Sequence, residues 1–539
     1  TLSAASTRTI TVEVSTVDQT ATAGTDFTGI TNQLVTFTPG QTVQTVEVSI
    51  IGDTAIEQEE FFEVVLTNAS NASILDGIGQ GNIQDNDNPG PTSTIGVNFQ
   101  GTDSTQIGFT PPDTMGAVGP DHIVELLNGR FAVYDKLTGA EITSSNSDQF
   151  VTANGGVIPA GQSVFDPRIV YDQDSGRWFA AFIDALTPAN TIYVMVSTSS
   201  DPTMPWQTVQ FIGDTVASNR FNDYETLSVD ADGVYLGTNN FVNNGGFDVS
   251  LYSIPKADLL AATPTIANLS RFENLNAGMF GSTPQPALDF GPSDGVAAFF
   301  SASGSGRITR TDISGATGPG AVLGTPIDIT VPAYTGAPPG DQPGGVTPLE
   351  NVSPRFGGNV VEVGSSFWMT HAVLDMGTGN SAVRWYEIDE NTNALLQTGT
   401  IVDPALDFLD PSIAVNDTGS VVIGYTGTGP AQSPSSYASI GQTTAGVTTF
   451  TPPTLLQQGT GTYVAAGGRN RWGDYSATVL DPANPAAFWT FQQLTIGNND
   501  FAVQITNVNI GAPPPPTPMP PPATTGVGYT IDGGDGNDN

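Results

Sequence analysis

Carboxylates are the one chemically versatile kind of side chain that this sequence supplies in quantity. The 539 residues include 53 Asp and Glu, 14 Lys and Arg, two histidines and no cysteine, for a net charge of −39. Without thiolates, and with only His122 and His371, cysteine-based or multi-histidine metal sites are not expected. The metal that suits an oxygen-rich chain is calcium, which the composition therefore predicts as the cofactor.

Four aspartates recur at the same point of a repeated unit, in which Asp precedes Pro or Tyr and a short apolar strand follows. They are Asp166, Asp223, Asp410 and Asp474. If they begin the innermost strands of a ring, they would surround one mouth of its channel and hold a cation or a polar ligand. Alternatively, each aspartate accepts backbone N–H groups within its own unit and has a structural role.

The elements that must position these residues are strands. Alternating β-branched stretches, such as residues 9–14 and 43–50, are short and are separated by Gly, Asn, Asp and Pro. The Asp-opened unit recurs at intervals of roughly 45 to 70 residues, each with room for about four strands. Weaker copies near 115–135, 285–295 and 354–368 fill the gaps. We predict an all-β chain whose large block is a six- or seven-bladed β-propeller, with seven preferred; a second array of sandwiches would not explain the repeated opening.

Composition divides the chain into four parts. An Asp/Asn-rich segment ends a first block at about residue 90, and 92–511 is the propeller block. Residues 512–523 are almost all proline, an extended spacer, and 524–539 form a short tail.

The first block has a specific pattern. Residues 16–27 (TVDQTATAGTDF), 35–42 (VTFTPGQT), 59–68 (EEFFEVVLTN) and 79–87 (GQGNIQDND) follow one another at strand spacing. This block resembles a Calx-beta domain, which implies an immunoglobulin-like sandwich that often binds calcium at one end. The resemblance implies ligands at one loop end, and carboxylates gathered there repel unless a cation neutralises them. The implied ligands are Asp26, Asp53, Glu57, Asp85 and Asp87; the alternative is that they are solvated turn residues.

Members of that family normally begin with one more strand before the segment that corresponds to residues 1–6. The sandwich is therefore expected to be incomplete, for one of two reasons. Either the piece was cut from a longer chain, or another molecule supplies the strand. An unpaired edge is a template for strand addition, so the second alternative predicts self-association into a fibre.

The tail ends in a glycine- and aspartate-rich segment. Residues 533–538 (GGDGND) resemble the calcium-binding repeat of RTX proteins, which implies Asp535 and Asp538 as ligands shared with further repeats. In that family such repeats accompany secretion from bacteria, so we expect a secreted or cell-surface protein.

The charge balance also limits partners and function. Nucleic acid and anionic membranes are excluded because both require a basic surface, and no apolar run approaches the length of a membrane helix. We predict a calcium-stabilised structural or adhesive surface protein that associates with itself, with other surface proteins or with polysaccharide. The alternative is a secreted propeller hydrolase or lyase for polysaccharide, with Glu225 as an acid or base and Arg168, Arg220 and Arg355 as substrate-binding cations beside the blade openings.

Overall fold

The computed structural model describes residues 1–52, 60–83, 91–186, 190–215, 220–242, 245–304, 306–315, 320–465 and 469–511. They fall into two compact units, one within 1–83 and one within 91–511. Strands are the main regular structure of both, which confirms the all-β prediction. None of the helices among the described residues is long and apolar enough to cross a membrane.

The first unit contains a four-stranded antiparallel sheet in the order β2-β1-β3-β4. Its strands are β1 (Ile10–Val17), β2 (Gln33–Phe37), β3 (Glu60–Ser70) and β4 (Ile78–Ile83). Phe27 and Phe62 are fully buried and stack with ring centroids 4.3 Å apart, and Val48 and Ile50 pack against them. The core therefore lies between this sheet and the segments that carry Phe27 and Ile50, which also form a bridge.

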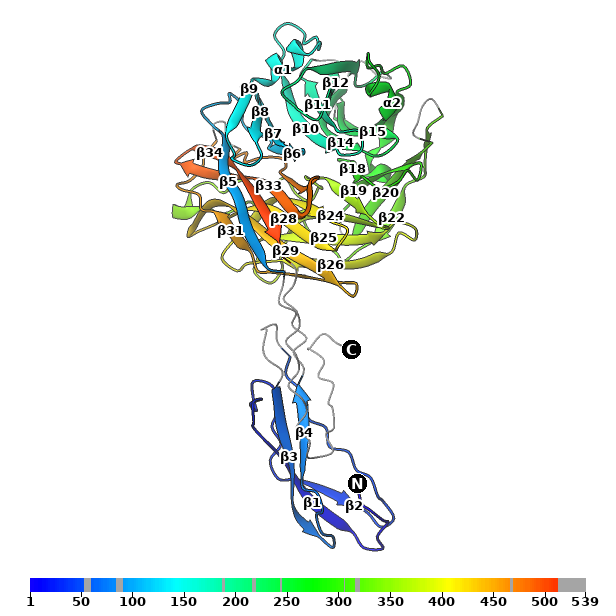
Figure 1. The fold of residues 1–539 in the computed structure, drawn as a ribbon, viewed down its shortest axis with the longest axis vertical. Coiled ribbons are helices and arrows are strands. Elements are labelled where there is room, and N and C mark those ends of the chain that lie inside the picture. Colours follow the sequence, from blue (N-terminus) through cyan, green and yellow to red (C-terminus); the bar gives the residue numbers. More distant parts are fainter. Residues whose placement is uncertain are drawn as a thin grey trace. The chain divides into compact units, whose positions relative to one another are not determined.

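In the second unit the described strands form seven antiparallel blades, so the propeller prediction is confirmed with the larger of its two blade numbers (Figure 1). Blade 1 consists of β6 (Met115–Val118), β7 (His122–Leu127), β8 (Arg130–Asp135) and β9 (Glu141–Ser145). Blade 2 consists of β10 (Val164–Asp172), β11 (Arg177–Asp184), β12 (Thr191–Ser197) and β13 (Trp206–Ile212). Blade 3 consists of β14 (Arg220–Val229), β15 (Gly233–Val242), β16 (Gly246–Pro255) and β17 (Ser270–Asn276).

Blades 4 and 5 are joined, because their first strands, β18 and β23, pair in parallel. Blade 4 consists of β18 (Gln285–Asp289), β19 (Val296–Ala302), β20 (Arg307–Ser314), β21 (Val322–Leu323) and β22 (Ile327–Thr330). Blade 5 consists of β23 (Val360–Val363), β24 (Ser366–Leu374), β25 (Ser381–Asp389) and β26 (Leu395–Ile401). Blade 6 consists of β27 (Asp407–Val415), β28 (Ser420–Gly429), β29 (Gln432–Thr444), β30 (Val447–Phe450) and β31 (Thr454–Gln457).

The ring is closed by a strand from the other end of the propeller. Blade 7 consists of β32 (Ala477–Asp481), β33 (Asn484–Gly497), β34 (Asp500–Ile510) and β5 (Ser93–Asp103). The blue strand β5 lies along the orange-red β34, with Phe99 opposite Ile505 (Figure 1). The first strands of the seven blades contact one another in sequence, and β32 contacts β6 again.

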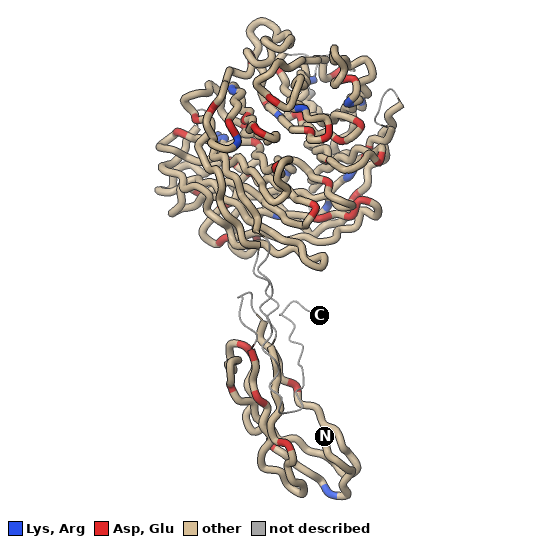
Figure 2. The backbone as a smooth tube through the Cα atoms, in the orientation of Figure 1, with Lys and Arg blue, Asp and Glu red and all other residues tan. Residues whose placement is uncertain are grey.

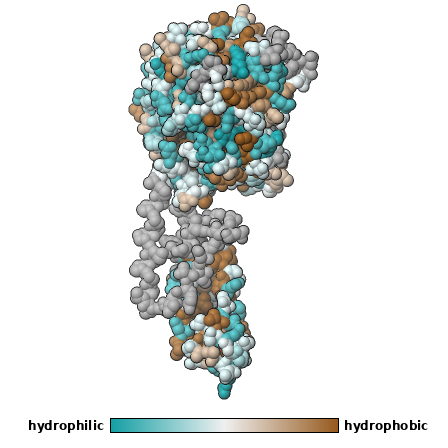
Figure 3. All heavy atoms as spheres, turned by 90° about the vertical axis from the view of Figure 1, so that its right-hand side faces the viewer, coloured by the Kyte–Doolittle hydropathy of each residue, from teal (hydrophilic) through white to brown (hydrophobic). Residues whose placement is uncertain are grey.

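The surface of this unit is acidic but mixed in polarity. Red segments outnumber blue ones along the backbone (Figure 2), and hydrophobic residues are scattered among polar ones on the side that Figure 3 turns to the viewer. In the described part of this unit, four short helical segments interrupt the strands: α1 (Ser147–Ala153), α2 (Lys256–Leu259), α3 (Ala277–Phe280) and the 3-10 turn η1 (Pro343–Gly345).

Candidate functional site

The aspartates that open the blades converge near the axis of the propeller. Asp166, Asp223 and Asp410 lie on the first strands β10, β14 and β27, and Asp474 precedes β32. A fifth residue, Asp113, precedes β6. Burial and the charges of the other members raise the pKa of Asp166 and of Asp410 to about 8 and that of Asp223 to about 6. We call these five residues the axial acidic cluster.

A backbone irregularity accompanies three of these aspartates. The pairing of the first two strands shifts register after Phe165, Asp223 and Leu409, in blades 2, 3 and 6. At these bulges Asp166 has φ 52° and Asp410 has φ 47°, in the left-handed region that Asp tolerates better than most residues. In blades 2 and 6 the repeated Asp of the sequence therefore marks the left-handed residue of a bulged first strand.

In blade 3 the left-handed residue is Tyr224, with φ 54°. Aromatic residues rarely adopt positive φ, so this conformation requires support from surrounding residues. The guanidinium of Arg355 lies 3.8 Å from the centre of its ring, and the ring meets Tyr475 edge-on at 5.6 Å. Its hydroxyl donates to the carbonyl oxygen of Asp474 across 3.1 Å.

Two of the aspartates accept hydrogen bonds from a neighbouring blade. Asp166 Oδ2 accepts the N–H of Tyr224 at 3.2 Å, which joins blades 2 and 3. Asp113 Oδ1 accepts the N–H of Asp474 at 2.9 Å, and its Oδ2 accepts Asn128 Nδ2 at 2.7 Å. The alternative in which each aspartate serves its own blade is therefore wrong for Asp166, whose recorded acceptor contact is with blade 3. Asp113, which was not predicted, contacts both its own blade and blade 7.

Two arginines that the sequence did not single out as a pair lie among the acids. Arg355 Nη2 is 3.2 Å from Asp474 Oδ2, and Arg471 forms an ion pair with the other oxygen of Asp474. Arg471 also lies 3.6 Å from Glu350. No group of three acids among the described residues is close enough to hold a metal ion.

Arg168 links several blades next to the cluster. Its side chain is fully buried, and Nε donates to the carbonyl oxygen of Glu225 at 2.9 Å while Nη1 donates to that of Gly357 at 3.0 Å. The guanidinium also lies 3.6 Å from the ring centre of Tyr475. One side chain thus connects blades 2, 3, 5 and 7. We call the partly exposed end of the acidic cluster, at Asp474, Arg355 and Arg471, the axial mouth.

The three arginines predicted to bind substrate in a polysaccharide hydrolase or lyase do not form a group. Arg168 is inaccessible, and Arg220 pairs with Asp214 and Asp248 at 3.1 and 2.7 Å. Of the three predicted arginines only Arg355 lies in the mouth. Glu225, the predicted acid or base, is fully buried.

The predicted calcium ligands are mostly outside the described residues. This applies to Asp53, Glu57, Asp85, Asp87, Asp535 and Asp538. Asp26 is described, and its Oδ2 accepts the N–H of Thr22 at 2.7 Å in a tight turn. Calcium binding by these residues and the RTX-like tail remain predictions.

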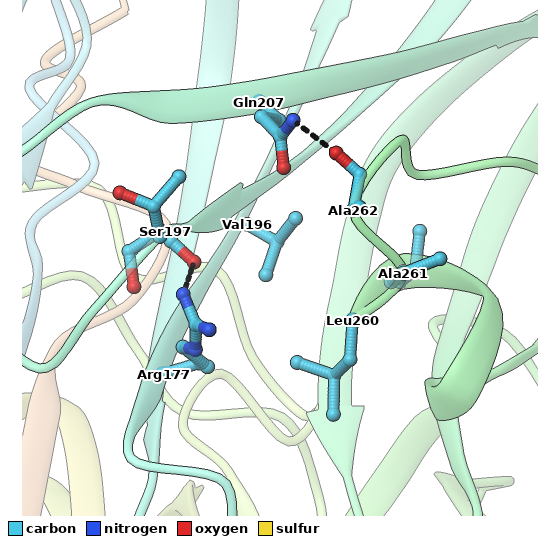
Figure 4. Close-up of a pocket in the computed structure, with 9 residues that line it drawn as sticks. Arg177, Val196, Ser197, Gln207, Leu260, Ala261 and Ala262 are labelled. Atoms are coloured by element: carbon cyan, nitrogen blue, oxygen red, sulfur yellow. Dashed lines mark hydrogen bonds between the residues drawn. The ribbon is translucent and has the colours of Figure 1, made fainter.

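A pocket of about 180 Å³ lies on the side of the propeller, between blade 2 and the segment after α2 (Figure 4). Its polar groups already have partners: Arg177 Nη1 donates to the carbonyl oxygen of Ser197 at 2.9 Å, and Gln207 Nε2 donates to that of Ala262 at 3.1 Å. The remaining wall is aliphatic, with Val196 and Leu260. The lining has no carboxylate or histidine, and the hydroxyls of Ser197 and Thr198 donate to backbone carbonyl oxygens. The axial mouth is therefore the better candidate site.

Residues 2–87 match the Calx-beta domain family, which confirms the resemblance of the first block. A comparison with curated protein sequences finds no match.

Solved structures similar to the chain include propellers. The extracellular domains 1–2 of Drosophila Semaphorin 1b share 8% identity, with a TM-score of 0.38, over 78% of this chain and 88% of that one. The Dos1 propeller shares 11% identity, with a TM-score of 0.37, over 78% and 96%. An endo-arabinase from Bacteroides thetaiotaomicron shares 13%, with a TM-score of 0.30, over 52% and 93%. The assignment of a propeller rests on the strand pairing of this chain itself.

Proposed function

We propose that this chain belongs to an extracellular, calcium-stabilised adhesive surface protein whose propeller binds a saccharide at its axial mouth. The observation that carries the proposal is the convergence of acids from five blades on two arginines at one partly exposed place. Asp474 keeps 11% of its side-chain surface exposed, Arg355 18% and Arg471 28%. A mouth that offers both acceptors and guanidinium donors suits the hydroxyl groups of a sugar.

Binding is tested with the whole chain on an array of polysaccharides. Asp223→Asn and Arg471→Gln change donors or acceptors at the mouth and are expected to weaken binding by about tenfold, as for the loss of a charged hydrogen bond. Asp328→Asn, an exposed carboxylate on β22, is the matched control and should bind like the natural chain. If no polysaccharide is bound, or if all three variants bind equally, the proposal is wrong.

Self-association through the first unit is part of the proposal. The described sheet ends in β2 on one side and in β4 on the other, and exposed edges accept strands from other molecules. Light scattering and electron microscopy of the chain over a range of concentrations test this point. Fibres that disappear when proline replaces Gln80 in β4 or Leu34 in β2 would support it; a monomer at every concentration would contradict it.

Hydrolysis of polysaccharide is the second candidate function, and one observation favours it. At pH 7 Asp410, with a pKa of about 8, holds its proton, whereas Asp223, with a pKa of about 6, is ionised. A protonated and an ionised carboxyl near one ligand are the requirement for acid–base cleavage of a glycosidic bond. Release of reducing ends that is abolished by Asp410→Asn, with binding retained, would identify an enzyme; binding without turnover identifies an adhesin.

A further inference from the structure

Strand β4 forms one edge of the sheet in the first unit. Among the residues that the structure describes, its only strand partner is β3, with Phe62 opposite Gly81 and Val64 opposite Gly79. The edge that faces away from β3 therefore presents the N–H and C=O groups of an unpaired strand. A sheet edge of this kind accepts a further strand.

The core of this unit is open beside β4. Directly opposite residues share one face of a sheet, so Gly79 and Gly81 lie on the same face as the buried Phe62. A Cβ atom at Gly81 would meet the ring of Phe62, whereas a Cβ atom at Gly79 would meet no heavy atom of the described residues within 4 Å. Val64 and Ile83 are only partly buried against this core. A strand added at β4 would bring further apolar side chains over it.

The sequence after the proline spacer alternates like a strand with one apolar side. Val527, Tyr529 and Ile531 are separated by the small residues Gly528 and Thr530, in a segment outside the described residues. β-Branched and aromatic residues with a period of two are typical of a strand that is buried on one face. The segment 525–531 therefore has the pattern that the open side of the core requires.

The tail leaves the propeller next to the attachment of the first unit, because the N–H of Gly511 donates to the carbonyl oxygen of Thr92 across 2.8 Å. Ile83, the last residue of β4, is nine residues from Thr92. A chain of that length spans at most about 32 Å. Residue 525 is fourteen residues beyond Gly511, and an extended proline-rich chain of that length spans about 43 Å. The segment therefore reaches the Ile83 end of β4 wherever the first unit lies.

We propose that residues 525–531 add to β4 of the same chain as an antiparallel strand. The direction is that of the shortest connection, in which the segment arrives at the Ile83 end of β4 and runs towards its other end. With the apolar side on the core, Tyr529 stands opposite Gly79 and Val527 opposite Gly81. An aromatic side chain across from an edge glycine fills the space that the glycine leaves.

The same chain is the source of the strand because of its tether. A linker that spans the two sites gives the segment an effective concentration in the millimolar range, which a second copy in dilute solution does not reach. The inference goes beyond the proposed function. It implies that β4 becomes available to a second copy only when this segment leaves it.

Engineered cysteines test the contact, because the natural chain has none. Gln80 and Gly528 stand opposite each other in this register, on the outer face, so Gln80→Cys with Gly528→Cys should form a disulfide within one chain. Leu34→Cys with Gly528→Cys is the matched control, since Leu34 lies on the same face at the opposite edge of the sheet. It would be about 19 Å from the added strand, whereas a disulfide needs Cα atoms within about 7 Å. Non-reducing electrophoresis and peptide mass spectrometry identify the products.

Amide hydrogen exchange tests the strand in the whole chain without a covalent link. Tyr529→Glu places an unpaired charge over the core and should release the segment, so the amides of β4 should exchange at least about tenfold faster. Thr530→Glu introduces the same charge on the outer side and should exchange like the natural chain. Unchanged exchange of β4 in Tyr529→Glu would overturn the proposal.

The outcomes separate this inference from the proposed self-association. Disulfide-linked dimers and longer ladders of Gln80→Cys with Gly528→Cys would mean that the segment is donated to a second copy, which overturns the assignment to the same chain and supports self-association. Cross-linking to both edges alike, or to neither, overturns the added strand. An internal disulfide in a chain that light scattering finds monomeric at every concentration supports this inference and contradicts self-association.

Discussion

Lysine is used in this chain only as a buried link between blades. The sequence has two lysines, and Lys136 and Lys256 are 9% and 6% exposed. Lys136 Nζ lies 2.9 Å from Asp481, which joins blades 1 and 7, and Lys256 Nζ lies 3.0 Å from Asp172, which joins blades 3 and 2. Both lysines follow the third strand of their blade, and both aspartates end the first strand of the preceding one. The two pairs are therefore equivalent in the ring.

We expect Lys136→Met to destabilise the propeller strongly. Asp481 would stay buried without its cation, and breaking a buried ion pair in this way costs about 3–5 kcal/mol. Arg307→Met breaks an exposed pair with Asp328, whose side chains are 39% and 53% accessible, and should cost less than about 1 kcal/mol. Urea unfolding of both variants provides the comparison, and equal midpoints would show that the buried pair contributes no more than the exposed one.

The axial acids make stability depend on pH. Asp166 and Asp410 have pKa values of about 8 in the folded chain and about 3.9 when unfolded, so the folded state binds protons more tightly. Their contribution to the free energy of unfolding is complete below pH 4 and is lost as pH rises towards 8. The denaturant concentration at the unfolding midpoint should therefore decrease as the pH is raised from 6 to 8, and it should decrease less in Asp410→Asn. An identical decrease in that variant would contradict the raised pKa of Asp410.

At the scale of the element, β5 determines whether the ring closes. It pairs with β34 along its length, and Asn98 accepts side-chain hydrogen bonds from Gln504 and Thr506 on that strand. A chain beginning at Gly90 keeps β5 and should fold as a propeller. A chain beginning at Ser104 lacks it, exposes the edge of β34 and should melt lower and aggregate. Thermal melting with light scattering compares the two, and equal behaviour would mean that closure by β5 is dispensable.

Local sequence pattern predicted the strands better than the long-range contacts that join them. The strands of the blades were predicted because alternation and turn residues are local signals. The repeated Asp, at Asp166 and Asp410, marked the first strands of two blades. The closure by β5 was not predicted, since no local pattern links residues about 400 positions apart. Arg471 was missed for a related reason. It lies in an irregular segment, and its place in the candidate site depends on ion pairs with Asp474 and Glu350, of which Glu350 is far away in the sequence.

At the scale of the whole molecule, the two units are expected to unfold separately. The described residues divide into compact units within 1–83 and 91–511, each with its own core. Scanning calorimetry should therefore show two transitions, of which the smaller belongs to the Calx-beta unit because enthalpy scales with size. A single transition at all scan rates would indicate that the units depend on each other.

Calcium is expected to act on only one of these transitions. A ligand that binds the folded state raises its stability by an amount that grows with concentration, about 2.7 kcal/mol at 100 times the dissociation constant. If the carboxylates implied by the Calx-beta resemblance hold calcium, EGTA should lower the temperature of the smaller transition by several degrees. The larger transition should stay in place, because no three acids of the described propeller residues are close enough to bind an ion.

Magnesium at the same concentration should not restore the smaller transition, since magnesium prefers a small octahedral site and keeps its water. Asp26→Asn should reproduce part of the loss in calcium, and Asp500→Asn, an exposed change in the propeller, should not. A smaller transition that is indifferent to EGTA would refute calcium stabilisation, and a shift of the larger one would place the ion in the propeller instead.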